Sequence, residues 1–232
     1  MAEAVKMDGP PVSGEAAKTP EKITLEGAYV TVEPLDPARH GESLWKDMGG
    51  PENAELWRYM HSGPFESREA FDAYLAAKAT SRDPLYFTVI DRAANRPGGH
   101  ATYLRIDPGQ RVVEVGSIVF THAFQRTRAA TEAMYLMAKH AFEDLGYRRY
   151  EWKCNDLNGP SKRAAVRLGF TFEGVFRQHV IVKGRNRDTA WFSMLDSEWP
   201  LRRAAFERWL SPDNFDAAGR QKVSLANLNG AL

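Results

Sequence analysis

Apolar and polar residues along this chain repeat with two periods, one typical of strands and one typical of helices. Segments with the period of a strand, or short apolar runs, are 29–35, 85–90, 100–106, 111–120, 148–153, 170–182 and 188–195. Segments with a helical period are 37–48, 67–80, 127–145, 158–168 and 198–210, and 53–60 is a short helical or irregular piece. The order of these elements predicts an α+β fold with a mixed sheet.

Local signals fix several helix ends. Asp36, Ser67 and Asn158 each precede a helical segment and can accept hydrogen bonds from its first N–H groups, so we predict that they are N-caps. Pro37 follows Asp36 at a favoured first helical position. Gly146 comes directly after the long helix and is expected to be its C′ residue.

Composition divides the chain into a central domain and two ends. Residues 1–22 are rich in Ala, Pro, Gly, Glu and Lys and are expected to be a disordered tail. Residues 213–232 are expected to be a C-terminal tail. The domain predicted between them covers residues 23–212, and an apolar content of 43% over the whole chain is enough to build its core.

Several classes of protein are disfavoured. A net charge of +1 gives no bulk attraction to nucleic acid, and no apolar run reaches the length of a membrane span. The first residues lack the apolar core of a secretory signal, and a single cysteine, Cys154, fits a reducing cytoplasm. The histidine spacings show no metal motif, so we expect no metal, and neither a P-loop nor a hydrolase elbow is present.

The stretch from Glu114 to Glu132 predicts a strand, a turn and the first turn of a long helix. Free N–H groups and the positive end of the helix dipole point at such a turn, so it can bind an anion. Residues 125–130 are therefore a candidate seat for a phosphate-bearing ligand. The alternative is an ordinary turn that binds nothing, with Arg126 and Arg128 solvated at the surface.

The order Gln125-x-x-Arg128-x-Ala130 resembles the acyl-CoA signature of the GNAT acetyltransferase superfamily, usually written Q/R-x-x-G-x-G/A. Arg128 stands where the family usually has glycine. Its side chain could crowd the pyrophosphate, or its guanidinium could pair with a phosphate.

A second block follows about thirty residues later. Asn158-Gly-Pro-Ser161, then Leu168-Gly169-Phe170 and Glu173-Gly174, is similar to the corresponding run of the ribosomal-protein N-terminal (alanine/serine) acetyltransferases. The resemblance covers roughly residues 28–200. It implies a mostly antiparallel seven-stranded sheet with helices on both faces and a splay between the strands at Glu114 and Arg148.

The resemblance also implies the activity. We expect a cytoplasmic acetyl-CoA-dependent N-acetyltransferase whose acceptor is a protein N-terminus or a small amine, attacked directly with the help of a carboxylate base. A homodimer is left open. Cofactor-binding residues implied by the resemblance are Ile118, Val119 and Phe120 on the strand, Gln125, Arg126, Thr127, Arg128, Ala129, Ala130 and Thr131 at the turn, and Asn158 and Ser161 on the next helix.

Two residues are candidates for proton transfer. Glu114 lies between two valines on a central strand, where burial would raise its pKa toward that of a base active near neutral pH. Alternatively, Glu114 is a surface glutamate or pairs with an arginine. Asp107 and His122 are the other candidates for the base. Ser161 is the candidate acid, since the tyrosine that many GNAT enzymes carry would fall on Ala165. Its alternative role is to satisfy a local backbone group.

Two other functions compete with this prediction. One is a non-catalytic acyl-CoA sensor, which Arg128 would favour if it blocked productive seating. The other is transfer of a larger acyl group such as succinyl. Within the acetyltransferase interpretation, an α-amine is a weaker base than a lysine side chain and loses its proton more easily, which favours an α-amino acceptor.

Overall fold

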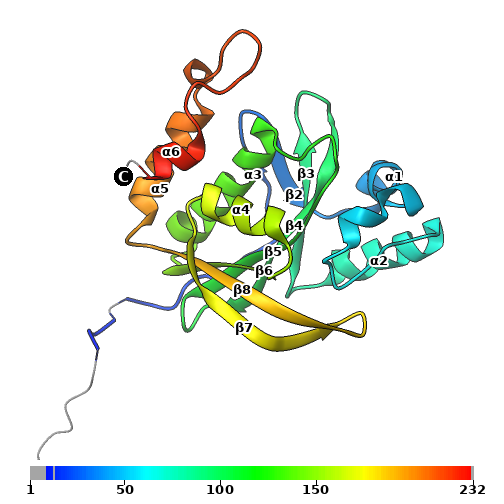
Figure 1. The fold of residues 1–232 in the computed structure, drawn as a ribbon, viewed down its shortest axis with the longest axis horizontal. Helices are drawn as coiled ribbons and strands as arrows, with labels where there is room; N and C mark the ends of the chain where they lie inside the picture. The colour runs from blue at the N-terminus through cyan, green and yellow to red at the C-terminus, as the bar shows by residue number, and fades with distance from the viewer. Residues whose placement is uncertain (1–8, 13, 231–232) are drawn as a thin grey trace, which may run out of the picture.

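The computed structural model describes residues 9–12 and 14–230 of the chain. Its strands form one eight-stranded sheet in the order β1-β2-β3-β4-β5-β6-β8-β7 (Figure 1). They are β1 (Leu25–Glu26), β2 (Val30–Pro34), β3 (Leu85–Asp91), β4 (Arg96–Asp107), β5 (Val112–Phe120), β6 (Arg149–Asn155), β7 (Thr171–Val182) and β8 (Arg185–Leu195). Neighbouring strands are antiparallel except β5 and β6, which are parallel.

Helices connect the strands at most of the predicted places. The α-helices are α1 (Pro37–Met48), α2 (Arg68–Thr80), α3 (Arg128–Lys139), α4 (Gly159–Arg167), α5 (Trp199–Leu210) and α6 (Leu225–Gly230). The short helices are η1 (Pro51–Trp57), η2 (His140–Asp144), which continues α3 with wider turns, and η3 (Pro212–Asn214). The predicted caps are confirmed, because Asp36, Ser67 and Asn158 each accept N–H groups of the helix that follows.

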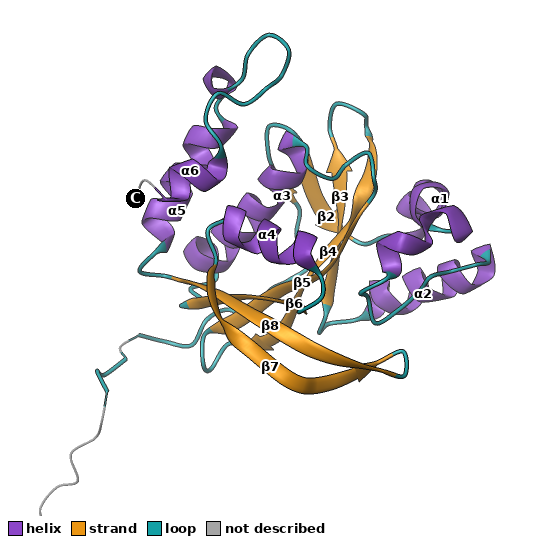
Figure 2. Cartoon of the chain, in the orientation of Figure 1, coloured by secondary structure: helices purple, strands orange, loops and turns teal. Residues whose placement is uncertain are grey.

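Helices cover both faces of the sheet because alternate strand residues point to opposite sides. Phe87 of β3 and Met137 of α3 belong to the larger core, which α5 and α6 also help to build. The next residue back along β3, Tyr86, packs in a second core with Leu44 of α1 and Leu75 of α2. Figure 2 shows α1 and α2 on one side of the sheet and α3, α5 and α6 on the other.

The predicted seven strands are present, and the structure adds an eighth. Strand β1 is only two residues long and pairs antiparallel with β2 through Leu25 and Glu26. Two residues cannot show a period of two, so the sequence pattern could not reveal it. Strand β4 also starts at Arg96, earlier than predicted, because the turn ends at Asn95, which has a φ of 48°.

The C-terminal segment differs from the tail expected over residues 213–232. Leu225 and Leu228 of α6 are buried in the main core, and the side chain of Asn214 bonds the backbone of Val223. Leu225 and Leu228 are one helical turn apart, so they lie on the same face of α6 and pack together against the core. Residues 231–232 lie outside the described residues.

The N-terminal segment touches the domain before residue 23. The N–H of Ala17 donates to the carbonyl of Pro108 at 3.0 Å, and that of Lys18 to the carbonyl of Leu145 at 2.8 Å. Residues 1–8 and 13 lie outside the described residues, so the disorder expected for them stays a prediction. The boundaries of the central domain, 23 and 212, stay predictions.

Strand β5 contains a bulge. Between the pairs His100–Val119 and Thr102–Gly116, β5 has one residue more than β4, and Ser117 takes a left-handed φ of 46°. The hydroxyl of Thr102 donates to the carbonyl of Gly116 at 2.9 Å. The bulge bends β5 and re-aims its backbone groups.

Strands β5 and β6 separate soon after they meet. They pair over three residues only, from Val112 to Glu114 on β5 and from Arg149 to Glu151 on β6. This is the predicted splay between the strands at Glu114 and Arg148, and it opens the sheet toward the N-terminus of α3.

Glu132 ties α3 to the edge of the sheet. This buried carboxylate accepts the N–H groups of Ala28, Tyr29 and Val30 at 2.9, 2.6 and 2.9 Å. Three charge-assisted hydrogen bonds thus hold the start of β2 against the first turns of α3, next to the candidate phosphate turn.

We expect Glu132→Gln to lower the free energy of unfolding by about 3 kcal/mol, because the amide nitrogen would face a backbone N–H and leave it without an acceptor. Urea unfolding measures the loss. Glu69→Gln is the matched control, since Glu69 is exposed on α2, and it should change stability by less than about 0.5 kcal/mol. Equal losses in the two variants would show that the bonds of Glu132 are not stabilising.

Candidate active site

A cavity of about 1040 Å³ fills the gap between β5 and β6 and extends past both strands. Its walls come from β5, the turn before α3, β6, the start of α4, the β7–β8 hairpin, the loop after η1 and the C-terminal segment. The predicted residues that line it are Glu114, Ile118, Phe120, Gln125, Arg126, Thr127, Arg128, Ala130, Thr131, Asn158 and Ser161.

Two predicted residues are not in the cavity wall. The side chain of Val119 packs in the core under α1 and α2. Ala129 is buried in the main core, so only its backbone can serve a ligand.

The turn before α3 keeps free donors. The hydroxyl of Thr127 caps the helix by accepting the N–H of Ala130 at 3.1 Å. Arg126 has a left-handed φ of 65°. Within the described ranges, the N–H groups of Arg126, Arg128 and Ala129 have no acceptor. Free N–H groups at the positive end of a helix form a site for an anion.

Arg128 fits the turn without the flexibility of glycine, because it begins the regular helix α3. Its guanidinium donates to the hydroxyl of Tyr29 at 2.9 Å and lies 3.5 Å from the ring centre of Phe215. The side chain is thereby held between the N-terminal strand region and the C-terminal segment. Other arginines in the cavity wall near this turn are Arg126, Arg163 and Arg167, and Arg167 bonds the hydroxyl of Thr131 at 3.0 Å.

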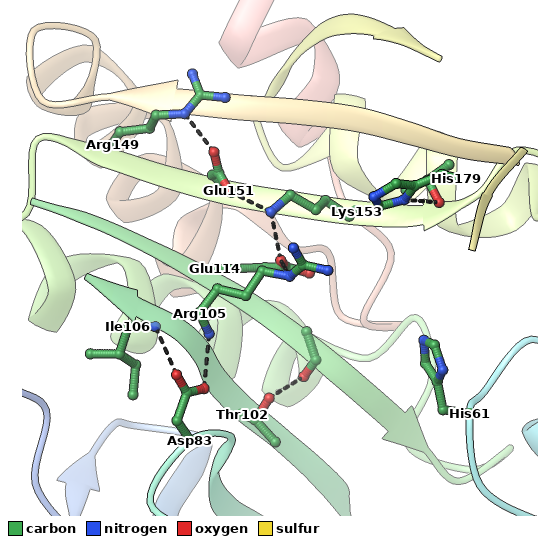
Figure 3. A network of polar contacts seen from close by, with 12 residues as sticks. His61, Asp83, Thr102, Arg105, Ile106, Glu114, Arg149, Glu151, Lys153 and His179 are labelled. Atoms are coloured by element: carbon green, nitrogen blue, oxygen red, sulfur yellow. Dashed lines mark hydrogen bonds and ion pairs between the residues drawn. The ribbon is translucent and has the colours of Figure 1, made fainter. Parts of the chain in front are cut away.

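Glu114 lies at the point where β5 and β6 part, with only 5% of its surface exposed (Figure 3). One of its oxygens is 2.9 Å from Nζ of Lys153 and 3.3 Å from Nε of Arg105. Lys153 also bonds Glu151 at 2.6 Å. Burial raises the pKa of Glu114, and the nearby Lys153 opposes that rise. The ion-paired glutamate that the sequence left open is therefore present, in the wall of the cavity.

The two alternative bases lie elsewhere. Asp107 is exposed and accepts the N–H of Gln110 in a turn, and His122 is exposed. Neither lines the cavity.

Two histidines of the cavity wall, His61 and His179, were not among the predicted site residues. His61 follows η1, and His179 lies on β7, where its Nδ1 is 3.0 Å from the hydroxyl of Thr189. Desolvation lowers the pKa of both, with Arg105 and Arg187 adding to the effect, so both rings favour the neutral form. No linear motif connects these positions, so no signal in the sequence could have found them.

Ser161 faces the cavity from the first turn of α4. Its N–H donates to the Oδ1 of Asn158 at 3.1 Å, and its hydroxyl oxygen accepts Nε1 of Trp152 at 3.0 Å. Asn158 thus caps the helix, and the hydroxyl proton of Ser161 is not needed for the cap. Cys154, a buried residue of β6, lines the same wall, and burial raises its thiol pKa.

The family model described as Acetyltransferase (GNAT) domain matches residues 33–171. A GCN5-related N-acetyltransferase from Brucella melitensis is similar at 46% identity and a TM-score of 0.91, over 94% of this chain and 98% of that one. A protein from Chromobacterium violaceum, described as a probable acetyltransferase of the GNAT family, is similar at 38% identity and a TM-score of 0.77, over 86% of this chain and 100% of that one. No match is found among the curated proteins.

The chain belongs to the GNAT acetyltransferase family and is an N-acetyltransferase by that membership. Its fold is also that of an acetyltransferase from Salmonella typhimurium that modifies the N-terminal serine of ribosomal protein L7/L12, with 17% identity, a TM-score of 0.62, and coverage of 73% of this chain and 96% of that one. Members of the family use acetyl-CoA as co-substrate.

None of the helices in the described ranges combines the length and the apolar composition of a membrane span. In residues 9–12 and 14–230, no cluster of His, Cys, Asp and Glu side chains is placed to hold a metal ion.

Arg126 and Arg128, both at the turn before α3, should have different roles: Arg126 in CoA binding and Arg128 in stability. Arg126→Ala should weaken binding of CoA and of dephospho-CoA, which keeps the pyrophosphate, by the same factor of about ten. The variant removes a cation that has no acidic partner among the described residues and lies beside the N–H groups of the turn. Arg128→Ala should mainly lower the melting temperature, because Arg128 is already held by Tyr29 and Phe215. Calorimetric titration and thermal unfolding measure the two effects, and a larger affinity loss for Arg128→Ala would reverse these roles.

Proposed function

We propose that this chain transfers the acetyl group of acetyl-CoA to a primary amine, either the α-amine of a protein N-terminus or that of a small molecule. The observation that supports it most is the continuity of the cavity. One space joins the free N–H groups before α3 to the buried carboxylate of Glu114, across the gap between β5 and β6.

The residues of the cavity fit acetyl-CoA. The N–H groups of the turn and Arg126 would hold the pyrophosphate, and the exposed edge of β5 around Ile118 would hold the pantetheine arm. Small side chains such as Ala130 leave space beside the turn. When bound, acetyl-CoA supplies an acetyl group activated as a thioester.

Residues of the chain would then assist the attack of the amine on the acetyl group. A backbone N–H among Ile118, Val119 and Phe120, on the bulged strand, would polarise the acetyl carbonyl. Glu114 would accept the proton of the amine, directly or through a water molecule, and Ser161 would donate a hydrogen bond to the departing sulfur. The single cysteine supports a cytoplasmic location for this reaction.

A non-catalytic acyl-CoA-binding role is the second candidate, because Lys153 and Arg105 already neutralise Glu114. Binding of acetyl-CoA without acetylation of any amine in a panel of N-terminal peptides and small amines would favour that role over the enzyme. Titrating succinyl-CoA beside acetyl-CoA tests a larger acyl group.

Glu114→Gln should lower the rate at saturating acetyl-CoA by about 10²–10⁴-fold and leave acetyl-CoA affinity nearly unchanged, because it removes a base and no phosphate contact. The raised pKa of Glu114 means that its carboxylate forms at higher pH than that of an ordinary glutamate. The wild-type rate should therefore rise with pH through that raised pKa, and the variant should lack this limb. A pH–rate profile measures both; a variant with the wild-type profile would move the base to another group.

Ser161→Ala should slow acetyl transfer by about tenfold to a hundredfold, because one hydrogen bond to the leaving sulfur is lost. The loss should shrink for a thioester whose thiol is more acidic, since a better leaving group needs less help. The variant also removes the acceptor of Trp152 Nε1, so its thermal stability must be measured alongside. Equal losses for both thioesters would show that Ser161 positions the substrate and does not assist departure.

A further inference from the structure

Arg187 of β8 lines the cavity without a carboxylate partner. Its Nη1 donates to Nε2 of His61 at 3.1 Å. Its Nε is buried and has no acceptor among the described residues, and no carboxylate of residues 9–12 and 14–230 lies within ion-pair distance of it. An arginine held in this way has donors to offer to a ligand.

The other cations that line this end of the cavity are paired with carboxylates. Lys153 and Arg105 pair with Glu114, Lys153 also pairs with Glu151, and Arg149 pairs with Glu151. Among the described residues that line the cavity, Glu114 is the one acidic residue, and Lys153 and Arg105 pair with it. Arg187 is therefore the cation of this part of the wall that pairs with no carboxylate among the described residues. Lys183, which lies outside the wall, donates to a carbonyl and likewise has no carboxylate partner in the described part of the chain.

The protein holds Arg187 in place. Two long-range hydrogen bonds fix the loop after η1 against the other side of the cavity: Nζ of Lys183 donates to the carbonyl of Trp57 at 2.9 Å, and the hydroxyl of Tyr59 donates to the carbonyl of Leu157 at 3.2 Å. His61 on this loop accepts from Arg187 as a neutral ring, so it orients the guanidinium without cancelling its charge.

A partly buried cation without a counter-charge is costly, and an anionic ligand offsets the cost. The planar fork of a guanidinium matches a carboxylate with two parallel hydrogen bonds. The N–H groups of the turn and Arg126, at the other end of the cavity, would hold the pyrophosphate, so Arg187 is not needed for it. We propose that Arg187 binds a carboxylate carried by the acceptor amine, a selectivity that rests on the proposed acetyl transfer.

The carboxylate can come from two sources, a small amino acid or an acidic side chain near a peptide N-terminus. The test therefore uses two matched pairs: β-alanine with β-alaninamide, and the tripeptide amide Ser-Glu-Ala with Ser-Gln-Ala. Calorimetry measures binding of each compound to the free protein and to its complex with CoA. Variants are Arg187→Gln, Arg187→Lys and the control Arg185→Gln, an exposed arginine at the start of the same strand and outside the cavity wall.

In the wild-type protein, the carboxylate member of one pair should bind about tenfold to a hundredfold more tightly than its amide. Arg187→Gln should remove this preference, Arg187→Lys should keep part of it, and Arg185→Gln should keep all of it. CoA affinity should be the same in every variant. Circular dichroism confirms that each variant is folded, and Arg187→Lys keeps the test valid if Arg187→Gln does not fold.

Equal binding of acid and amide in both pairs would overturn the proposal, as would a preference that survives Arg187→Gln. A parallel loss of CoA affinity in Arg187→Gln would also overturn it, because Arg187 would then serve the phosphates. Failure of CoA to bind at all would refute the proposed function instead, while the acid–amide comparison on the free protein would still decide the role of Arg187.

Discussion

The short parallel contact between β5 and β6 is the constraint on which the site depends. Pairing stops at Glu114 and Glu151, because the bulge at Ser117 turns β5 away. The bulge needs a close backbone approach: a Cβ on Gly99 of β4 would lie 2.1 Å from the carbonyl oxygen of Val119. Beyond the last pair, the facing edges of β5 and β6 no longer pair with each other in the described part of the chain, so backbone groups on these edges face the gap. Such groups are costly unless a ligand or water satisfies them, so the gap is suited to a polar, extended ligand.

The register of β5 and β6 places two glutamates side by side, and a lysine neutralises them. Glu114 and Glu151 are opposite each other in the parallel pair, where two buried carboxylates would repel. Lys153 lies between them, bonded to both, and its ammonium lies 3.9 Å from the ring centre of Trp191. Removing one member of such a cluster leaves an uncompensated buried charge. The cluster therefore holds Glu114 in one position at the end of the paired region while burial raises its pKa.

The far end of the cavity depends on the C-terminal segment. Phe215 packs on the guanidinium of Arg128, which also bonds Tyr29, while Trp209 lies over the guanidinium of Arg167. Arginine at the motif position of glycine and an ordered C-terminal segment are thus parts of one arrangement. The side chain that could have crowded a phosphate lies instead against two aromatic rings, Tyr29 just before β2 and Phe215 in the C-terminal segment.

Most of the elements, the helix caps at Asp36, Ser67 and Asn158, and the family could be predicted from the sequence, because they depend on period, capping chemistry and local motifs. It also named Glu114 and Ser161 as candidates for proton transfer, and the structure shows both in the cavity wall, on a splayed strand and a capped helix. The contacts of these residues could not be predicted, because they form only when the chain is folded. The ion pairs of Glu114, the contacts of Arg128 and the meeting of His61 with Arg187 join positions far apart in the chain. Strand β1 and helix α6 were missed for a related reason: each is too short to show a period and is stabilised by packing against the rest of the fold.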